Sequence, residues 1–459
     1  MENFIGTNAF LWQKLAVKVQ RDTTPEELQR ALQMGVTFFH IECGSYTSQE
    51  SIIMFDRCNE TIKNYAEQCQ PFTVANGIIC ELSGPYPRVQ FTSSGRSQVQ
   101  VIEHQRITLT ADVRYQNQCF DEVKYVTNFD QLKRSSVGDV LSIGTVKLMV
   151  ERIVSDFVTC RVTQAGFIKP FSVISNGSKD EQAILDVSST VEELERLADK
   201  GCTFIIVPKI DSKSLDTFLE SIRCKEQIAR NIQIIVQADG FPLSNQINGL
   251  DRCIDAFVSK DIVALKQLKA VGKAVLYDMD TEEMMTESIE EADVIIANVN
   301  DLTKVNEHLK HINRMQLELH QQSNRTLDPD DKPMATCLNF SAHETNASAI
   351  ILPLGKGNSK LATEVSLTNP LCIVLLLKTS TEEVHRILLR KYLMPVIVPP
   401  TKTNVSQQQL IRCAIAYGRR FGYLHGGNCI VTGFTLDSDT DVLGLDMRYV
   451  PLEAHRPEP

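Results

Sequence analysis

The chain has 459 residues, roughly three times a common domain length of about 150, so two or three packed units are expected. Its composition, with 43% hydrophobic and 23% charged residues, is that of a globular protein and excludes extended disorder as the default state. The formal net charge of −10 comes without a long basic run, which argues against a nucleic-acid footprint or an anionic membrane patch.

Short apolar runs rich in β-branched residues alternate with segments of helical periodicity, which is typical of strands that feed helices around a parallel sheet. The amphipathic segments TPEELQRALQMG and TVEELERLADKG each open on Thr, the expected N-cap, and end at Gly. Repetition of this strand–helix unit predicts a (β/α)8 barrel. Its strands are expected at 15–19, 36–41, 72–80, 203–210, 232–236, 254–258, 273–277 and 293–297.

The pattern changes between the third and fourth runs. From 85 to 170 the hydrophobic period is two, with turn residues at SSGRS and VGD, which predicts an inserted all-β domain. After a predicted helix, VNEHLKHINRMQLELHQQ, and a polar linker, SNRTLDPDDKP, further strands alternate with helices; they read ASAIILPL, LCIVLLL, MPVIVP and NCIVTGF.

The predicted fold class is therefore α/β, with a β domain inserted after the third strand of the barrel and an α/β domain at the C-terminus. The barrel is expected to comprise residues 1–84 and 171–320. The inserted β-barrel domain is expected at 85–170 and the C-terminal α/β domain at 331–459.

The sequence also indicates in which cellular compartment the protein is expected. The N-terminal segment MENFIGTNAFLWQKLAVKVQ lacks the basic and apolar regions of a secretory signal, and the longest apolar run, 371–377, is too short to cross a bilayer. The 13 Cys residues are irregularly spaced and form no C-x-x-C pair, which indicates reduced thiols rather than disulfides or a zinc site. We therefore expect a cytoplasmic protein that does not contact a membrane.

This order of domains resembles that of the pyruvate kinase family, and local stretches carry the resemblance. CELSGPYPRVQ (80–90) is similar to the family's DTKGPEIRTG turn, and IRCAIAYGRRFGYLHGGNCIVTGF (411–434) to its C-terminal pattern ending in TGW. Three barrel strands of the family are similar to MGVTFFHIECG, IQIIVQAD and GKAVLYDMD. The resemblance spans nearly the whole chain and implies phosphoryl transfer from phosphoenolpyruvate to ADP, with Mg²⁺ and K⁺ as cofactors.

That reaction brings two anions together, so its site depends on cations. By the resemblance, Gln237 stands where the family has a Lys, His40 where it has an Arg, and Met279 where it has the Thr that helps protonate the enolate. Glutamine carries no charge, histidine is mostly neutral near pH 7, and methionine donates no proton. Since losing one electrostatic stabiliser commonly costs roughly 10²- to 10³-fold in rate, near-complete loss of kinase activity is expected.

The resemblance also assigns metal and nucleotide positions. Asp239 and Asp261 align with the divalent-metal ligands, although Asp261 is alternatively a helix-start residue. Arg88 aligns with the Arg of the DTKGPEIRTG turn, where it either meets a nucleotide phosphate or binds carboxylates or backbone. The monovalent-cation ligands align with Glu42, Gly44, Glu81 and Leu82, which keeps carboxylates at two of the positions.

A glycine-rich loop follows the first strand of the C-terminal domain. Such a loop, between a strand and a helix N-terminus, favours anions, and it resembles the loop in which many pyruvate kinases hold the phosphate of a regulatory sugar bisphosphate. The same composition is typical of an exposed turn. The loop residues are Lys356, Gly357, Asn358, Ser359 and Lys360.

Two functions follow from these residues. The first is an impaired pyruvate kinase paralogue that serves as a partner subunit, scaffold or phosphometabolite sensor, either as a homo-oligomer or as a hetero-oligomer with an active pyruvate kinase. The second is an active or weakly active pyruvate kinase or a related phosphotransferase. It would use Asp239, Arg88 and relocated cations such as Lys209 or Lys260.

Overall fold

The computed structural model covers the chain with gaps, and the following description concerns only the described residues. They are 13–72, 74–90, 98–116, 122–176, 186–208, 212–225, 231–238, 253–279, 291–297, 311, 333–353, 358–378, 384–397, 406–437 and 440–452.

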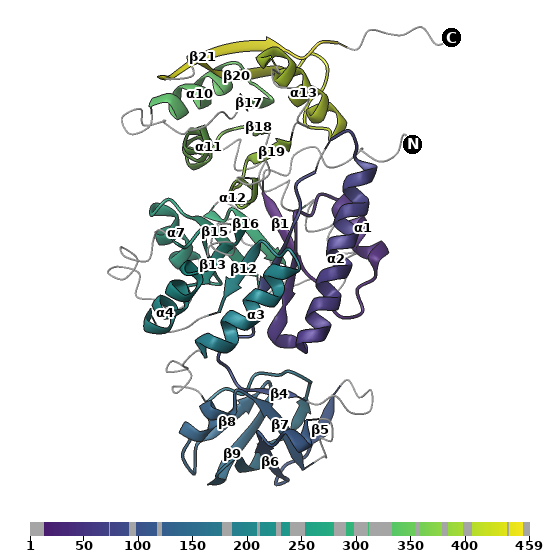
Figure 1. Cartoon of the computed structure of the whole chain (residues 1–459), viewed down its shortest axis with the longest axis vertical. Helices are drawn as coiled ribbons and strands as arrows, with labels where there is room; N and C mark the ends of the chain where they lie inside the picture. Colours follow the sequence, from purple (N-terminus) through teal and green to yellow (C-terminus); the bar gives the residue numbers. More distant parts are fainter. Residues whose placement is uncertain are drawn as a thin grey trace. The chain divides into compact units, whose positions relative to one another are not determined.

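The first sheet is a closed barrel of eight strands, which confirms the barrel predicted from the apolar runs (Figure 1). Its spatial order is β1-β16-β15-β14-β13-β12-β3-β2. Neighbouring strands are parallel, as where Lys14 of β1 lies opposite Val294 and Ala16 lies opposite Phe38. The strands are β1 (Lys14–Lys18), β2 (Phe38–Glu42), β3 (Gly77–Glu81), β12 (Phe204–Val207), β13 (Gln233–Gln237), β14 (Ala256–Ser259), β15 (Ala274–Met279) and β16 (Val294–Ala297).

The helices between these strands are α1 (Pro25–Gln33), α2 (Ser48–Gln68), α3 (Val187–Asp199), α4 (Ser212–Arg223) and α7 (Ile262–Ala270). Thr24 caps α1 in a capping box with Glu27, as predicted. The prediction that Thr190 caps α3 is wrong. Asp186 is the N-cap, because its carboxylate accepts from the backbone N–H of Ser189, while Thr190 lies inside the helix and its hydroxyl donates to the carbonyl of Asp186.

Between β3 and β12 the chain forms two antiparallel-rich sheets with a shared apolar core that includes Ile107, Leu148 and Val158. The larger has the order β4-β7-β6-β10-β9-β8, and the smaller pairs β11 with β5. Along β9, Val146, Leu148 and Val150 are buried in alternation, which is the period of two expected of a strand with one buried face. The elements are β4 (Arg88–Gln90), β5 (Val99–Val101), β6 (Arg106–Thr110), η2 (Val113–Tyr115), β7 (Val123–Thr127), η3 (Phe129–Arg134), β8 (Val140–Ile143), β9 (Val146–Val154), β10 (Phe157–Gln164) and β11 (Gly166–Ile168).

The C-terminal part contains a five-stranded sheet of order β19-β18-β17-β20-β21. Alternate residues of its strands enter two separate apolar clusters, with Ile350 in one and Ile351 in the other, so both faces are buried. Strand β21 runs antiparallel to β20 and was not predicted. The elements are α10 (Pro333–Glu344), β17 (Ala349–Pro353), α11 (Asn358–Leu367), β18 (Ile373–Lys378), α12 (Val384–Leu388), β19 (Leu393–Ile397), α13 (Gln407–Arg420), β20 (Cys429–Asp437) and β21 (Thr440–Tyr449).

The chain divides into two compact units, one of residues 1–41, 54–79 and 233–459 and the other of residues 42–53 and 80–232. This division differs from the three predicted domains, whose boundaries stay predictions. The predicted helix VNEHLKHINRMQLELHQQ falls outside the described residues except at position 311. Among the helices that the structure describes, none has the length and apolar character needed to span a membrane.

Candidate functional site

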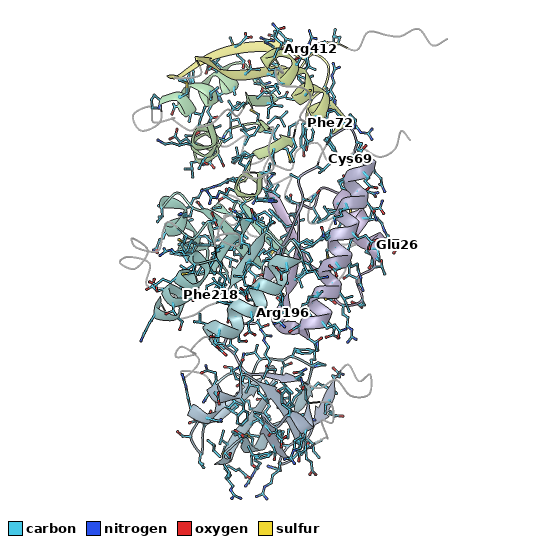
Figure 2. The ribbon with its side chains drawn as sticks, viewed as in Figure 1. Glu26, Cys69, Phe72, Arg196, Phe218 and Arg412 are labelled. Carbon is cyan, nitrogen blue, oxygen red and sulfur yellow. The ribbon has the colours of Figure 1, made fainter. Side chains whose placement is uncertain are left out.

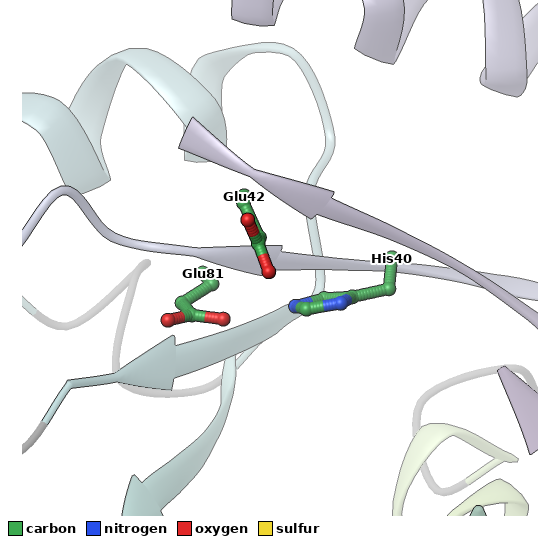
Figure 3. Close-up of side chains that lie close together, drawn as sticks. All are labelled: His40, Glu42 and Glu81. Atoms are coloured by element: carbon green, nitrogen blue, oxygen red, sulfur yellow. The ribbon is translucent and has the colours of Figure 1, made fainter. Parts of the chain in front are cut away.

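The carboxyl ends of the barrel strands bring polar side chains together. Glu42 is the last residue of β2 and Glu81 the last residue of β3, and His40 lies on the same face of β2 as Glu42 because side chains alternate along a strand. A ring nitrogen of His40 and a carboxylate oxygen from each glutamate all lie within 4.8 Å of one another. Figure 3 shows the three side chains converging between the strands.

Arg88, the first residue of β4, carries the positive charge beside these carboxylates. Its Nη1 donates to the carbonyl oxygen of Phe171 at 3.2 Å. Burial lowers the pKa of Arg88, while the negative charges of Glu81, Glu42 and Glu193 oppose that shift. Because arginine stays protonated near neutral pH, a half-buried guanidinium carries its charge in the field of three carboxylates. The hydrogen bond to Phe171 is the backbone contact that the sequence left open for Arg88.

Gly44 leaves the space that the guanidinium occupies. It lies in the short helix η1 (Cys43–Ser45), and a Cβ atom added there would stand 2.8 Å from Nη2 and 2.9 Å from Cζ of Arg88. The resemblance had aligned Gly44 with a ligand of a monovalent cation. In this structure the position instead permits close packing of Arg88.

Replacing Gly44 with alanine should therefore displace the Arg88 side chain. We expect a loss of about 0.5–1.5 kcal/mol in the free energy of unfolding, the usual net contribution of one hydrogen bond, because the guanidinium must move away from the carbonyl of Phe171. Urea titration of Gly44→Ala against the wild type measures it. Gly138→Ala offers a contrast, since Gly138 has φ +94° but an added Cβ meets no atom within 4 Å, so any loss there reflects backbone strain alone. An unchanged midpoint in Gly44→Ala would contradict the packing role.

Glu193 of helix α3 completes the cluster, and sequence reasoning missed it. Its carboxylate accepts two hydrogen bonds from Ser83, one from the hydroxyl at 2.7 Å and one from the backbone N–H at 3.1 Å. Burial raises the pKa of Glu193, and the hydrogen bonds from Ser83 and the charges of Arg196 and Arg88 reduce that rise. Nothing in the local sequence of α3 marks this residue, because Glu is equally common on exposed helix faces.

A second charged group lies at the ends of β1, β14 and β15. Nζ of Lys18 is 3.3 Å from a carboxylate oxygen of Asp278, and Nζ of Lys260 is 3.8 Å from the other. Lys18 and Asp278 are largely buried, whereas Lys260 is more exposed. Of these, the sequence had singled out Lys260 alone as a possible relocated cation.

Two of the residues that the resemblance aligns with catalytic positions lie at ends of barrel strands. Gln237 ends β13 and is half-buried, and Met279 ends β15 with 1% of its surface exposed. Asp261 is the N-cap of α7, where its carboxylate accepts from the backbone N–H of Val263 at 2.9 Å. It thus has the role of a helix-start residue. Asp239 and Lys209 lie outside the described residues.

The side chains at the monovalent positions do not fit the K⁺ site that the resemblance implies. Gly44 has no side chain, Leu82 is apolar and buried, and Arg88 already supplies positive charge to Glu42 and Glu81. The imidazole of His40 together with two carboxylates is a donor set closer to those that bind zinc or other transition metals than to the all-oxygen sites of hard cations.

The glycine-rich loop is only partly described. Lys356 and Gly357 lie outside the described residues, and Asn358 and Ser359 begin helix α11. Lys360 is exposed and its Nζ lies 3.9 Å from a carboxylate oxygen of Glu364, one turn further along the helix. The predicted phosphate site therefore stays a prediction.

A scan of protein-family models and a search of curated proteins found no match to this chain.

Proposed function

We propose that this chain is a pyruvate kinase-like barrel protein that has lost efficient phosphoryl transfer. Its finer architecture is proposed to be that of the family, with a β domain inserted after the third barrel strand and an α/β domain after the barrel. We propose that it acts as a partner subunit, scaffold or phosphometabolite sensor, either alone as an oligomer or with an active pyruvate kinase.

The main support for this proposal is the set of side chains at the ends of the barrel strands. Gln237 offers an amide where charge is needed, and the thioether of Met279 is buried and donates no proton. Arg88, the cation closest to the family pattern, donates to the backbone carbonyl of Phe171 and is subject to the negative charge of three glutamates. Stabilising the charge that develops during phosphoryl transfer requires cations that face the reacting groups, so these replacements support a loss of catalysis.

A turnover assay tests the proposal. Recombinant protein with phosphoenolpyruvate, ADP, Mg²⁺ and K⁺ should form no more pyruvate than its Gln237→Ala variant. An active pyruvate kinase measured in the same buffer is the positive control. Turnover by the wild type that Gln237→Ala abolishes would overturn the proposal, because it would show that Gln237 serves in catalysis.

A second candidate, a weak phosphotransferase with relocated cations, is favoured by the group of Lys18, Lys260 and Asp278. Two ammonium groups near one carboxylate can contact a phosphate when the carboxylate turns to one of them. Turnover that survives Gln237→Ala but is lost in Lys260→Met would support this candidate over the first.

A further inference from the structure

A cavity of about 380 Å³ lies at the opposite, N-terminal ends of barrel strands β1, β2 and β3, beside helix α13. Lys14 begins β1, Thr37 directly precedes β2 and Asn76 directly precedes β3, and all three line the cavity. Its size is within the range of about 300–1,000 Å³ that is usual for small-molecule sites. It is separate from the strand ends to which phosphoryl transfer is attributed, because Lys14 and Lys18 are at opposite ends of β1.

Aromatic rings form much of the wall. Tyr65 of α2, Tyr417 of α13, Phe421 and Tyr423 line the cavity. The rings support one another: the ring centroids of Tyr417 and Phe421 are 4.5 Å apart, and Phe72 packs edge-on against Tyr417 at 5.7 Å. Phe72 and Cys69, labelled in Figure 2, belong to the segment that ends α2 and leads toward β3. Interlocked rings make a preformed apolar surface of the kind that binds a ring-sized ligand.

Lys14 is the exceptional member of the lining. Its residue surface is 2% exposed, and among the described residues its ammonium group has no hydrogen-bond or ion-pair partner. Among the described residues, no Asp or Glu lines the cavity. Buried lysines are normally paired, since an isolated buried charge is costly. A lysine held in this way indicates that a ligand, rather than the protein, completes its interactions.

Burial lowers the pKa of Lys14 to about 7, and no neighbouring charge contributes to this shift. The other titratable groups on the wall are Tyr65, Tyr417, Tyr423, Cys69 and Arg420, of which none is an anion at neutral pH. Half of the Lys14 side chains are therefore uncharged amines near pH 7, whereas an exposed lysine is almost wholly protonated. Desolvation in an apolar pocket is one of the ways in which proteins make a lysine nucleophilic.

We infer that Lys14 is a nucleophilic amine that captures small aromatic carbonyl compounds in this cavity as an imine. The lone pair of Nζ attacks the carbonyl carbon, and the carbonyl π electrons move to oxygen, giving a carbinolamine after proton transfer. Loss of the hydroxyl as water then forms the C=N bond. One water is released for each imine, nothing is oxidised or reduced, and hydrolysis reverses the reaction.

The wall also offers hydrogen-bond donors that can support the departing hydroxyl. Burial raises the pKa of Tyr423 to about 12 and holds the pKa of Tyr417 well above its usual value, so both hydroxyls stay protonated at neutral pH. Asn76 presents a further polar atom: its Nδ2 donates to the carbonyl oxygens of Val36 and Thr37, whereas its buried Oδ1 has no hydrogen-bond partner among the described residues. That oxygen can accept from the carbinolamine hydroxyl.

Reductive trapping tests the inference. The full-length protein is incubated with benzaldehyde at pH 7.5 and treated with sodium borohydride, which converts an imine into a stable benzylamine. Intact-mass analysis should show the addition of one benzyl group, and peptide mapping should place it on Lys14 at an occupancy at least about tenfold above that of exposed Lys63. Trapping should fall by about tenfold from pH 8 to pH 6 as the amine becomes protonated.

Variants separate this chemistry from other outcomes. Lys14→Met should abolish the adduct, whereas Lys63→Met should keep it. If Lys14→Met fails to fold, the comparison of Lys14 with Lys63 inside the wild-type protein still decides. Occupancy at Lys14 no higher than at Lys63 would overturn the inference. Thermal stabilisation by sodium benzoate without a benzaldehyde adduct would also overturn it, because the cavity would then be an anion site.

Discussion

Replacing Lys14 with methionine should raise the free energy of unfolding by about 5 kcal/mol at pH 6 and by less than about 1 kcal/mol at pH 10. Methionine fills a similar volume without a charge to bury. The pKa of Lys14 falls from 10.5 to about 7 on folding because the amine is buried. Each unit of that shift corresponds to about 1.4 kcal/mol of cost to the charged form.

The direction of this pH dependence is set by the pH at which the folded and the unfolded chain each lose the Lys14 proton. Below pH 7 both the folded and the unfolded chain carry the charge, so folding bears the full cost of burying it. Between pH 7 and pH 10.5 the amine is neutral in the folded chain and charged in the unfolded chain. The cost of burying it therefore falls steadily as the pH rises and is gone above pH 10.5. The variant therefore gains most at low pH.

Urea titrations at pH 6 and pH 10 measure this difference, with Lys63→Met as the matched control. Lys63 is exposed, so its replacement should leave the midpoint nearly unchanged at both pH values. A gain in Lys14→Met that does not depend on pH would mean that packing, and not desolvation of the amine, sets the effect. A loss at pH 6 would show that the ammonium group has a stabilising partner.

Most of the barrel was predictable because its strands are short β-branched runs between amphipathic helices. Sequence LAVKV gave an expected strand at 15–19, and β1 spans Lys14–Lys18. The third strand was expected from 72, but β3 begins at Gly77, since the apolar residues Phe72 and Val74 pack outside the sheet, against Tyr417 and along the cavity. Apolar character shows that a segment is buried, but not which element buries it.

The candidate site was predictable only where strand ends supply it. Glu42 and Glu81 were named because the resemblance aligns them with ligands of a monovalent cation, and the structure brings their carboxylates together. Glu193 comes from a helix 110 residues away from its partner Ser83, and α3 gives no local sign of that contact. In the sequence, Lys14 resembles any charged residue at the start of a strand. Residues of α13, far along the chain, line the cavity that it enters. Long-range contacts of this kind have no signature in a single sequence.

Replacing Arg88 with methionine should lower the free energy of unfolding by about 1–3 kcal/mol at pH 8, because the variant loses the hydrogen bond to Phe171 and the positive charge that acts on three glutamates. The variant leaves Glu42 and Glu81, which lie close together, and Glu193 without the positive charge that acts on all three. Burial already raises the pKa of Glu193, and loss of the Arg88 charge removes one of the influences that oppose the rise.

The loss in Arg88→Met should shrink at pH 5. A carboxylate whose pKa is raised on folding lowers the free energy of unfolding while it is ionised. This loss is complete above the pKa of the folded chain and disappears as the pH falls to the pKa of the unfolded chain. Urea midpoints at pH 8 and pH 5 test this, with Arg114→Met as the control, because Arg114 pairs with Asp112 on the exposed surface and should contribute little. An equal loss at both pH values would show that Arg88 acts through packing against Gly44 and its bond to Phe171, and that the glutamates do not repel one another in its absence.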